Sequence, residues 1–223
     1  MTRPWEILET AQTPDGPLAL RRRGEADFTI AIRGRVLMTS TAHRSEDALA
    51  RLGCGGLGAH ARARVLIGGL GMGFTLRAAL DVLGPDAQVT VAELNPVVAA
   101  WCQGPLAALT ARAASDPRVQ VEITDVAKVI ARAGRSPASR FHAIVLDLYE
   151  GPQARVPPGD PLYGPRATAQ VVQALRAGGT YAVWCEQPSA GFERNLRGAG
   201  FTFDTTRSGR GGRVHLIYTA RVA

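Results

Sequence analysis

The sequence has a single lysine, few cysteines and no long apolar run. Lys128 is the only lysine, so arginine carries almost all of the positive charge. Cys54, Cys102 and Cys185 are widely spaced and include no C-x-x-C pair, which excludes a disulfide framework and matches no zinc-ligand spacing. No stretch reaches the roughly 18 apolar residues of a membrane-spanning helix. Because Met1–Gly16 also lacks the apolar core of a secretory signal, we expect a cytoplasmic protein with no metal and no membrane association.

The net charge of +7 is the feature that would point to nucleic acid. The arginines are scattered, however, and they cluster only at Arg21–Arg23 and in the loop Arg207–Arg213. Together with the abundant alanine and glycine, this distribution indicates a compositional bias and a solvated basic surface, so we do not expect a nucleic-acid partner. The chain has 223 residues, of which 46% are hydrophobic and 20% charged, and this balance is typical of a soluble globular protein with a sizeable core.

The first part of the chain has a short, β-like pattern. Thr13–Gly16 reads TPDG, a turn signal, and the runs Asp27–Ile32 and Arg35–Ser40 read as strands around a tight connection. Ser45–Asp47 then resembles the start of a helix. We therefore expect residues 1–60 to form a small β-rich appendage that ends in one helix.

From Arg64 onward, apolar runs alternate with helical stretches. The runs are Val65–Ile67, Val89–Glu93, Val119–Ile123, Ala143–Asp147 and Thr180–Trp184, and the helical stretches are Leu76–Leu83, Pro96–Cys102, Val126–Ala133 and Ala167–Leu175. Apolar strands joined by helices predict a parallel sheet that is covered on both faces. After a further helix, FTFDTT and VHLIYTA form a hairpin, so the last strand must be antiparallel to the others. Residues 61–223 are therefore predicted to form an α/β, Rossmann-like domain with a seven-stranded, methyltransferase-type sheet.

A glycine-rich loop follows the first strand of this domain. Ile67–Arg77 reads IGGLGMGFTLR and opens the next helix, which is where a doubly wound sheet binds ligands. A tight strand-to-helix turn is the alternative explanation for the glycines. The residues expected to contact a cofactor here are Gly68, Gly69, Gly71, Met72 and Gly73.

Two acidic residues mark the ends of the next two strands. Glu93 lies about twenty residues beyond the glycine loop, where a carboxylate accepts both ribose hydroxyls of a nucleoside. Asp125 is placed to accept from an adenine amino group, although it also suits the N-cap of the following helix, and both roles can coexist. Leu94 and Val126 are expected to line the same site. A dinucleotide is the rival ligand, but a second domain of the kind that most dehydrogenases use to hold substrate is missing.

The fourth strand ends in LDLYEGP, which places Asp147 and Glu150 at the carboxyl edge of the sheet. Two carboxylates there can bind an ammonium group and take a proton from a nucleophilic amine, so both are candidate catalytic residues; Glu150 could equally be a solvated loop residue. The candidates for an acceptor pocket are His43, Tyr149 and Tyr163, for which surface exposure or packing are the alternatives. The Pro- and Gly-rich loop Arg155–Pro165 is placed to act as a lid.

The motifs together resemble those of the spermidine synthases and their relatives. They are VLIGGLGMGFTLRAAL, VAELNPVV, ITDVAKVI, IVLDLYEGP and PLYGPRA, and the resemblance spans roughly Arg64 to Phe201. It implies that Glu93 binds ribose and that Asp125 binds adenine. It also implies that Asp147 and Glu150 are the two carboxylates of a D-x-x-D motif, which hold an aminopropyl chain and help to deprotonate the acceptor amine.

The sequence departs from this family at two places. Met72 stands where the family's loop has an Asp that binds the donor's ammonium group, and SEDALARL replaces a Tyr-His-Glu cluster of the polyamine site. A neutral loop removes the repulsion of an intact cofactor's carboxylate. The first hypothesis is therefore methyl transfer from S-adenosylmethionine to a small-molecule acceptor, and the second is aminopropyl transfer from decarboxylated S-adenosylmethionine to an amine. A non-catalytic nucleoside sensor is the third, and we allow for a homodimer.

Overall fold

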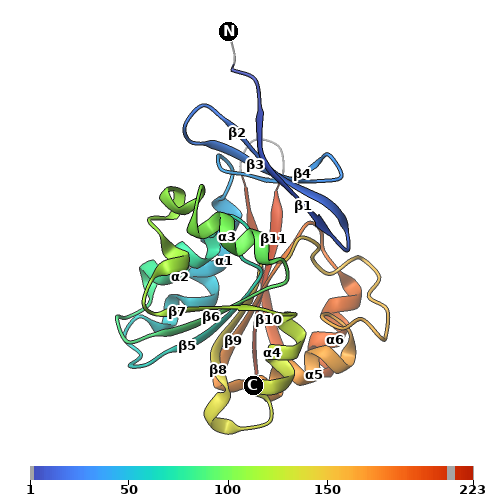
Figure 1. Cartoon of the computed structure of the whole chain (residues 1–223). Coiled ribbons are helices and arrows are strands. Elements are labelled where there is room, and N and C mark those ends of the chain that lie inside the picture. The colour runs from blue at the N-terminus through green and yellow to red at the C-terminus, as the bar shows by residue number, and fades with distance from the viewer. Residues whose placement is uncertain (1–2, 210–213, 223) are drawn as a thin grey trace.

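The computed structural model describes residues 3–209 and 214–222, which form two sheets (Figure 1). The small sheet is antiparallel, in the order β1-β2-β3-β4. Its strands are β1 (Glu6–Thr13), β2 (Gly16–Arg23), β3 (Asp27–Ile32) and β4 (Arg35–Thr39). The pattern predicted β3, β4 and the turn before β2, but not β1 or β2 themselves. Strand β2 ends in three successive arginines. These charged residues follow the buried run Leu18–Leu20 directly and interrupt the apolar pattern by which a strand is predicted.

The large sheet has seven strands in the order β10-β11-β9-β8-β5-β6-β7. Its strands are β5 (Arg64–Gly68), β6 (Gln88–Glu93), β7 (Val119–Ile123), β8 (Phe141–Leu146), β9 (Leu175–Cys185), β10 (Phe201–Ser208) and β11 (His215–Val222). Strands β5 to β9 pair in parallel, and β11 is antiparallel to both of its neighbours. The predicted α/β fold class is confirmed, including the terminal hairpin. Part of the basic loop Arg207–Arg213 lies outside the described residues.

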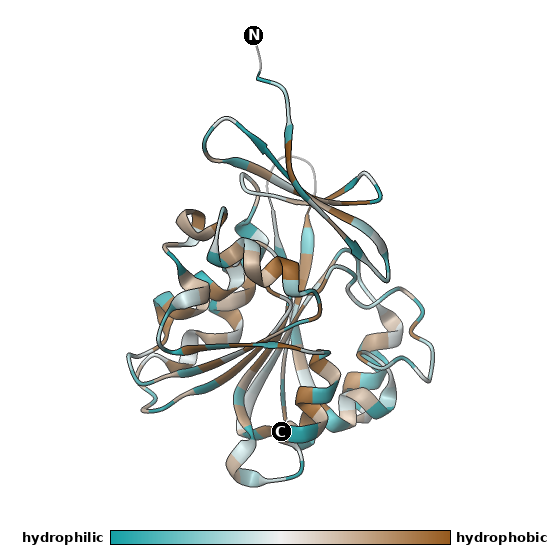
Figure 2. Cartoon of the chain, viewed as in Figure 1, coloured by the Kyte–Doolittle hydropathy of each residue, from teal (hydrophilic) through white to brown (hydrophobic). Residues whose placement is uncertain are grey.

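Helices cover both faces of the large sheet. They are α1 (Arg44–Cys54), α2 (Phe74–Val82), α3 (Pro96–Gln103), α4 (Val126–Ala133), α5 (Pro165–Ala174) and α6 (Ala190–Gly198), with short 3-10 turns at Gly55–Leu57, Ala107–Thr110, Ala113–Ser115 and Pro137–Ser139. Along β5, Val65 and Ile67 join one hydrophobic cluster with α1 to α3, whereas Leu66 joins another with α4 to α6. Because both faces of the central strands are covered, β5 and β8 are buried and apolar along most of their length, and brown predominates in the middle of the sheet (Figure 2). No helix in the described ranges is long and apolar enough to cross a membrane.

Helix α1 packs on the large sheet, although the sequence placed it in the appendage. Its residues Leu49, Ala50 and Cys54 are fully buried. At Gly53, a Cβ atom would lie 2.7 Å from Val145 and 3.1 Å from Ala182, both on strands of the large sheet. The small size of Gly53 therefore lets α1 approach β8 and β9 closely.

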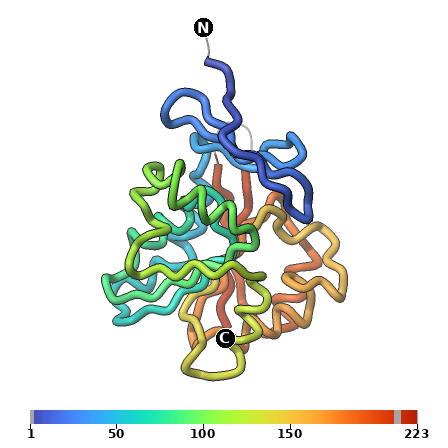
Figure 3. The backbone as a smooth tube through the Cα atoms, in the orientation of Figure 1, coloured from blue at the N-terminus to red at the C-terminus, as the bar shows by residue number. Residues whose placement is uncertain are grey.

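The small sheet lies across one end of the large sheet, next to the tips of the terminal strands (Figure 3). A hydrogen bond of 2.7 Å from Trp101 Nε1 on α3 to Glu9 Oε2 on β1 ties the two parts together. On β4, Met38 comes so close to the glycine loop that a Cβ atom at Gly71 would lie 2.9 Å from its sulfur. The small sheet therefore covers the loop that follows β5.

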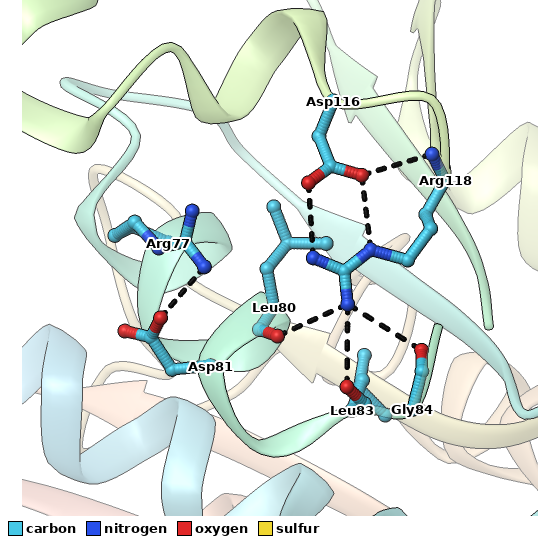
Figure 4. A network of polar contacts seen from close by, with 7 residues as sticks. All are labelled: Arg77, Leu80, Asp81, Leu83, Gly84, Asp116 and Arg118. Atoms are coloured by element: carbon cyan, nitrogen blue, oxygen red, sulfur yellow. Dashed lines mark hydrogen bonds and ion pairs between the residues drawn. The ribbon is translucent and has the colours of Figure 1, made fainter. Parts of the chain in front are cut away.

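A paired charge network lies at the amino end of β7 (Figure 4). The Nε and NH2 groups of Arg118 each donate to Asp116 at 2.9 Å. Its NH1 group donates to the carbonyl oxygens of Leu80 at 3.1 Å and Leu83 at 3.2 Å. These carbonyls have no further helical turn to bond to, so Arg118 caps the end of α2.

Candidate active site

A cavity of about 700 Å³ opens at the carboxyl ends of β5 to β8, where an open α/β sheet binds ligands. The glycine loop and the residues that follow β6, β7 and β8 form its floor, and the small sheet forms its cover. Of the residues expected at a cofactor site, the cavity is lined by Gly69, Gly71, Glu93, Leu94, Asp125, Val126 and Asp147. The cavity is large enough for a nucleoside and a small acceptor together.

Two glycines let the backbone of the loop turn into the cavity. Gly69 has φ +87°, and a Cβ atom there would overlap the carbonyl oxygen of Asp147. Gly71 has φ +53° and lies beneath Met38. Other residues at these positions would be strained and would clash. Gly68 and Gly73 do not line the cavity: Gly68 packs against Leu146 and Val126, and Gly73 is the N-cap of α2.

The structure corrects the expectation for Met72. Its side chain is completely buried in the cluster beneath α1 to α3 and does not line the cavity. Only glycines of the loop reach the cavity, so no side chain of this loop meets a ligand there directly. Gly69 and Gly71 do line the cavity, whereas Met72, which follows Gly71, does not, because successive residues of so tight a turn point in different directions.

Glu93 is held in place by two backbone groups. It is 6% exposed, and its Oε2 accepts from Leu70 N at 2.9 Å while its Oε1 accepts from Asn95 N at 2.8 Å. The carboxylate thus fastens the glycine loop to the end of β6. Each oxygen keeps a second lone pair, so the group can still accept from a ligand that lies in the cavity.

Asp125 caps the helix that follows β7. Its Oδ1 accepts from Ala127 N at 2.8 Å, which confirms the N-cap expected from the sequence. Because Asp125 also lines the cavity, its other oxygen is available to a ligand. Val126 and the exposed Leu94 provide apolar surface in the same cavity.

Asp147 is the carboxylate at the end of β8. Its Oδ2 accepts from Thr75 Oγ1 at 2.5 Å. Burial and, to a lesser extent, the nearby charge of Glu46 raise the pKa of Asp147 to about 7, against the opposing effect of the Thr75 hydrogen bond. A carboxyl group with such a pKa is suited to take up and release a proton near neutral pH.

The sequence reasoning missed Glu46 as a site residue. Glu46 is on α1, is 9% exposed and lines the cavity near Asp147. Its spacing to Leu49, Ala50 and Gly53 is i, i+3, i+4 and i+7, which is the buried stripe of an amphipathic helix. An acidic residue in such a stripe was the available signal, because a buried carboxylate needs a partner or a function.

The candidate catalytic residue Glu150 and the three candidate acceptor residues fall into two groups. Glu150 and Tyr149 are exposed and line the cavity. Tyr163 is buried and does not line it; its hydroxyl donates to the carbonyl oxygen of Glu150 at 3.1 Å and supports the loop after β8. His43 does not line the cavity either, and its ring stacks on Phe74 at 4.2 Å. Both side chains have packing contacts in this structure, and a contact of either with an acceptor stays a prediction.

The loop Arg155–Pro165 is tied to its surroundings. Asp160 Oδ1 accepts from the backbone of Leu162 at 2.9 Å and of Tyr163 at 2.7 Å. Asn195 on α6 donates to the carbonyl oxygen of Tyr163 at 2.9 Å. Leu162 is the one residue of this loop that lines the cavity. These bonds favour an anchored wall over a freely moving lid.

No family model and no curated protein sequence matches the chain. Similar structures include a spermidine synthase from Thermotoga maritima, with a TM-score of 0.75 and 18% sequence identity over 96% of this chain and 72% of that one. A spermidine synthase in complex with the transition state analogue AdoDATO has a TM-score of 0.74 and 17% identity over 96% and 71%. The chain has the fold of the spermidine synthases. The resemblance seen in the motifs therefore extends to the three-dimensional arrangement of the strands and helices.

Proposed function

We propose that the protein is a transferase that binds an S-adenosylmethionine-type nucleoside and passes an alkyl group to a small acceptor. The observation that carries this proposal is one cavity with carboxylates at both ends of its floor: Glu93 and Asp125 after β6 and β7, and Asp147 and Glu150 after β8. The solved spermidine synthase complexed with AdoDATO, a transition state analogue, supports it through the shared fold.

The nucleoside half of the cavity would be organised by Glu93 and Asp125. Glu93 is already fixed by Leu70 N and Asn95 N, so little freedom is lost when it accepts from ribose hydroxyls. Asp125 has one oxygen left for the amino group of adenine. Leu94 and Val126 would contact the two faces of the base.

The reacting half would be organised by Asp147 and Glu150. In the transfer, the acceptor's lone pair forms a bond to a carbon attached to the sulfonium. The old carbon–sulfur bond breaks, and its electron pair stays on sulfur to give a neutral thioether. An amine acceptor must also lose a proton, which a carboxylate in the cavity can take.

For the transferred group, we propose methyl from intact S-adenosylmethionine. The glycine loop presents only Gly69 and Gly71 to the cavity, so it offers no carboxylate that would repel the donor's own. Aminopropyl transfer is the second candidate, and the carboxyl groups of Glu46, Asp147 and Glu150 favour it because they suit a cationic donor or acceptor. A nucleoside sensor, a homodimer and a cytoplasmic location stay predictions.

Calorimetric titration of the wild-type protein tests this function. The ligands are S-adenosylmethionine, its decarboxylated form, S-adenosylhomocysteine and methylthioadenosine. The first two, which are the possible donors, are also mixed with the protein and a panel of small amines, and mass spectrometry identifies any product. We expect intact S-adenosylmethionine to bind at least as tightly as the decarboxylated donor and to yield a methylated amine. A strong preference for the decarboxylated donor would replace methyl by aminopropyl transfer. Nucleoside binding without any product from the panel would favour the sensor, and absence of binding would refute the nucleoside site.

A further inference from the structure

A row of three polar side chains leads away from the cavity. Glu46 lines the cavity, and its Oε2 accepts from Ser45 Oγ at 2.6 Å. Ser45 Oγ in turn lies 3.2 Å from Nδ1 of His215, at the start of β11. Ser45 is 6% exposed and Glu46 9%, whereas His215 is partly exposed beside the ring of Trp184, at 4.7 Å between ring centres. We call Glu46, Ser45 and His215 the proton chain.

The proton chain has two arrangements with the same number of protons. In the first, Glu46 is ionised, Ser45 donates to it, and a charged His215 donates from Nδ1 to Ser45. In the second, Glu46 is protonated and donates to Ser45, and Ser45 donates to Nδ1 of a neutral His215. Moving one proton along each of the two hydrogen bonds interconverts them. A serine hydroxyl is suited to this role because it donates and accepts at the same time.

One carboxylate oxygen of Glu46 is not engaged by the proton chain. Its Oε1 has no hydrogen-bond partner among the residues that the structure describes, while Oε2 is engaged by Ser45. The charged groups around the chain are Asp147 at the end of β8 and, on α1 itself, Arg44 and Asp47. Asp47 is already bonded to His43 at 3.0 Å. Among the described residues, Glu46 is therefore the member of this group that connects the cavity to an imidazole.

We propose that Glu46 takes the proton of the acceptor and passes it through Ser45 to His215, which releases it to solvent. This proposal rests on the proposed transferase function. As the acceptor bonds to the transferred carbon, its proton moves to the Glu46 carboxylate. The Glu46 proton then moves to Ser45 Oγ, the Ser45 proton moves to His215 Nδ1, and the imidazolium gives a proton to water. Imidazole is the side chain best suited to this last step near neutral pH.

Nuclear magnetic resonance tests whether the chain exists, without any ligand. The ring nitrogen signals of His215 are compared at one fixed pH in variants with and without the Glu46 carboxyl group. We expect Glu46→Gln to change the Nδ1 signal of His215, because the change at Glu46 is transmitted through Ser45. The same substitution should have no effect on this signal in a Ser45→Ala background. Ser208→Ala is the matched control background, because it removes a serine hydroxyl that bonds to the carbonyl oxygen of Arg44, next to Ser45, and should leave the response to Glu46→Gln unchanged. A His215 signal that does not respond to Glu46→Gln in the otherwise wild-type protein would overturn the proposal.

Kinetics test whether the chain carries the proton in turnover. With the acceptor that reacts best in the amine panel, Ser45→Ala should lower kcat about tenfold, a fraction of the usual general-base contribution. Its KM should stay unchanged and its solvent deuterium isotope effect should rise. A Ser45→Ala variant with the wild-type kcat and isotope effect would overturn the proposal. Failure of the wild type to bind S-adenosylhomocysteine refutes the proposed function instead, and the magnetic resonance comparison of the variants then decides on the chain alone.

Discussion

Two groups of charged side chains lie at opposite edges of the large sheet, and they differ in how their charges are compensated. At the amino edge, Asp116 accepts two hydrogen bonds from the guanidinium group of Arg118 and one from its backbone N–H, and Arg118 also bonds to the end of α2. At the carboxyl edge, Asp147 lies near a second carboxyl group, Glu46, and receives a single side-chain hydrogen bond from Thr75. Opposite charges meet at one edge and like charges at the other.

The pKa values of the two aspartates shift in opposite directions. The hydrogen bonds from Arg118 lower the pKa of Asp116 below its ordinary value of 3.8. Burial, helped by Glu46, raises that of Asp147 to about 7. The ionised Asp116 therefore stabilises the fold above about pH 4, and this contribution is lost as the pH falls further. Ionisation of Asp147 costs stability, so its contribution declines as the pH rises from about 4 to about 7. Such destabilising groups are typical of sites that react.

The largest effect on stability is expected from Arg118→Ala. The substitution leaves Asp116 and the carbonyls at the end of α2 without their donor, so the free energy of unfolding at pH 7 should fall by about 2–3 kcal/mol. Chemical denaturation measures it. Arg22→Ala is the control, because Arg22 and Glu6 are 41% and 62% exposed and such pairs contribute less than about 1 kcal/mol. Equal losses in the two variants would contradict a structural role for the Arg118 network.

Glu93→Ala tests the role of a carboxylate whose charge is stabilised by two backbone N–H donors. If Glu93 binds ribose as proposed, the variant loses hydrogen bonds that are each worth roughly 1.5–3 kcal/mol, so affinity for S-adenosylhomocysteine should fall at least about tenfold. Calorimetry measures the affinity, and thermal unfolding without ligand checks that the glycine loop still folds. Leu94→Ala, which removes apolar surface from the same cavity, should weaken binding less. Wild-type affinity in Glu93→Ala would show that the nucleoside binds elsewhere.

Asp147→Asn is expected to increase stability, whereas most substitutions decrease it. The amide cannot ionise, so at pH 8 the variant should be more stable than the wild type, by about 1–2 kcal/mol after allowance for partial exposure. The difference should disappear below about pH 4, where the wild-type group is also neutral. Asp116→Asn should do the opposite, with a loss of stability at pH 7 that vanishes at low pH. Urea denaturation over this pH range measures the stability of both variants. Equal pH profiles would contradict the inference that the two aspartates affect stability in opposite directions.

The smallest change is expected from Glu46→Gln. It removes the weaker of the two causes that raise the pKa of Asp147, so this pKa should fall from about 7 but stay above its ordinary value, because burial remains. Carbon magnetic resonance of the Asp147 carboxyl group measures the midpoint. Glu150→Gln is the control with the same charge change and should move the midpoint less. A midpoint that does not respond to Glu46→Gln would mean that the two carboxyl groups are not coupled.

From Arg64 onward, the sequence was sufficient for the alternation of strands and helices and for the edge of the sheet at which the candidate site lies. Hydrophobic runs with short helices between them define a parallel sheet by local pattern alone. The carboxyl ends of parallel strands share an edge, so residues that follow each strand must gather there. For that reason the strand pattern by itself brings Glu93, Asp125 and Asp147 to one edge of the sheet. The same reasoning located the glycine loop, since only glycine tolerates the backbone at Gly69.

Only the tertiary structure decided which side chains turn toward the cavity at that edge. Met72 is directed into the core because neighbouring glycines with positive φ rotate the loop between successive residues. Ser45 and His215 are 170 residues apart, and Glu46 reaches the cavity only because α1 packs on β8 and β9. A local pattern has a range of a few residues, whereas these contacts depend on how a helix and an antiparallel hairpin meet across the sheet.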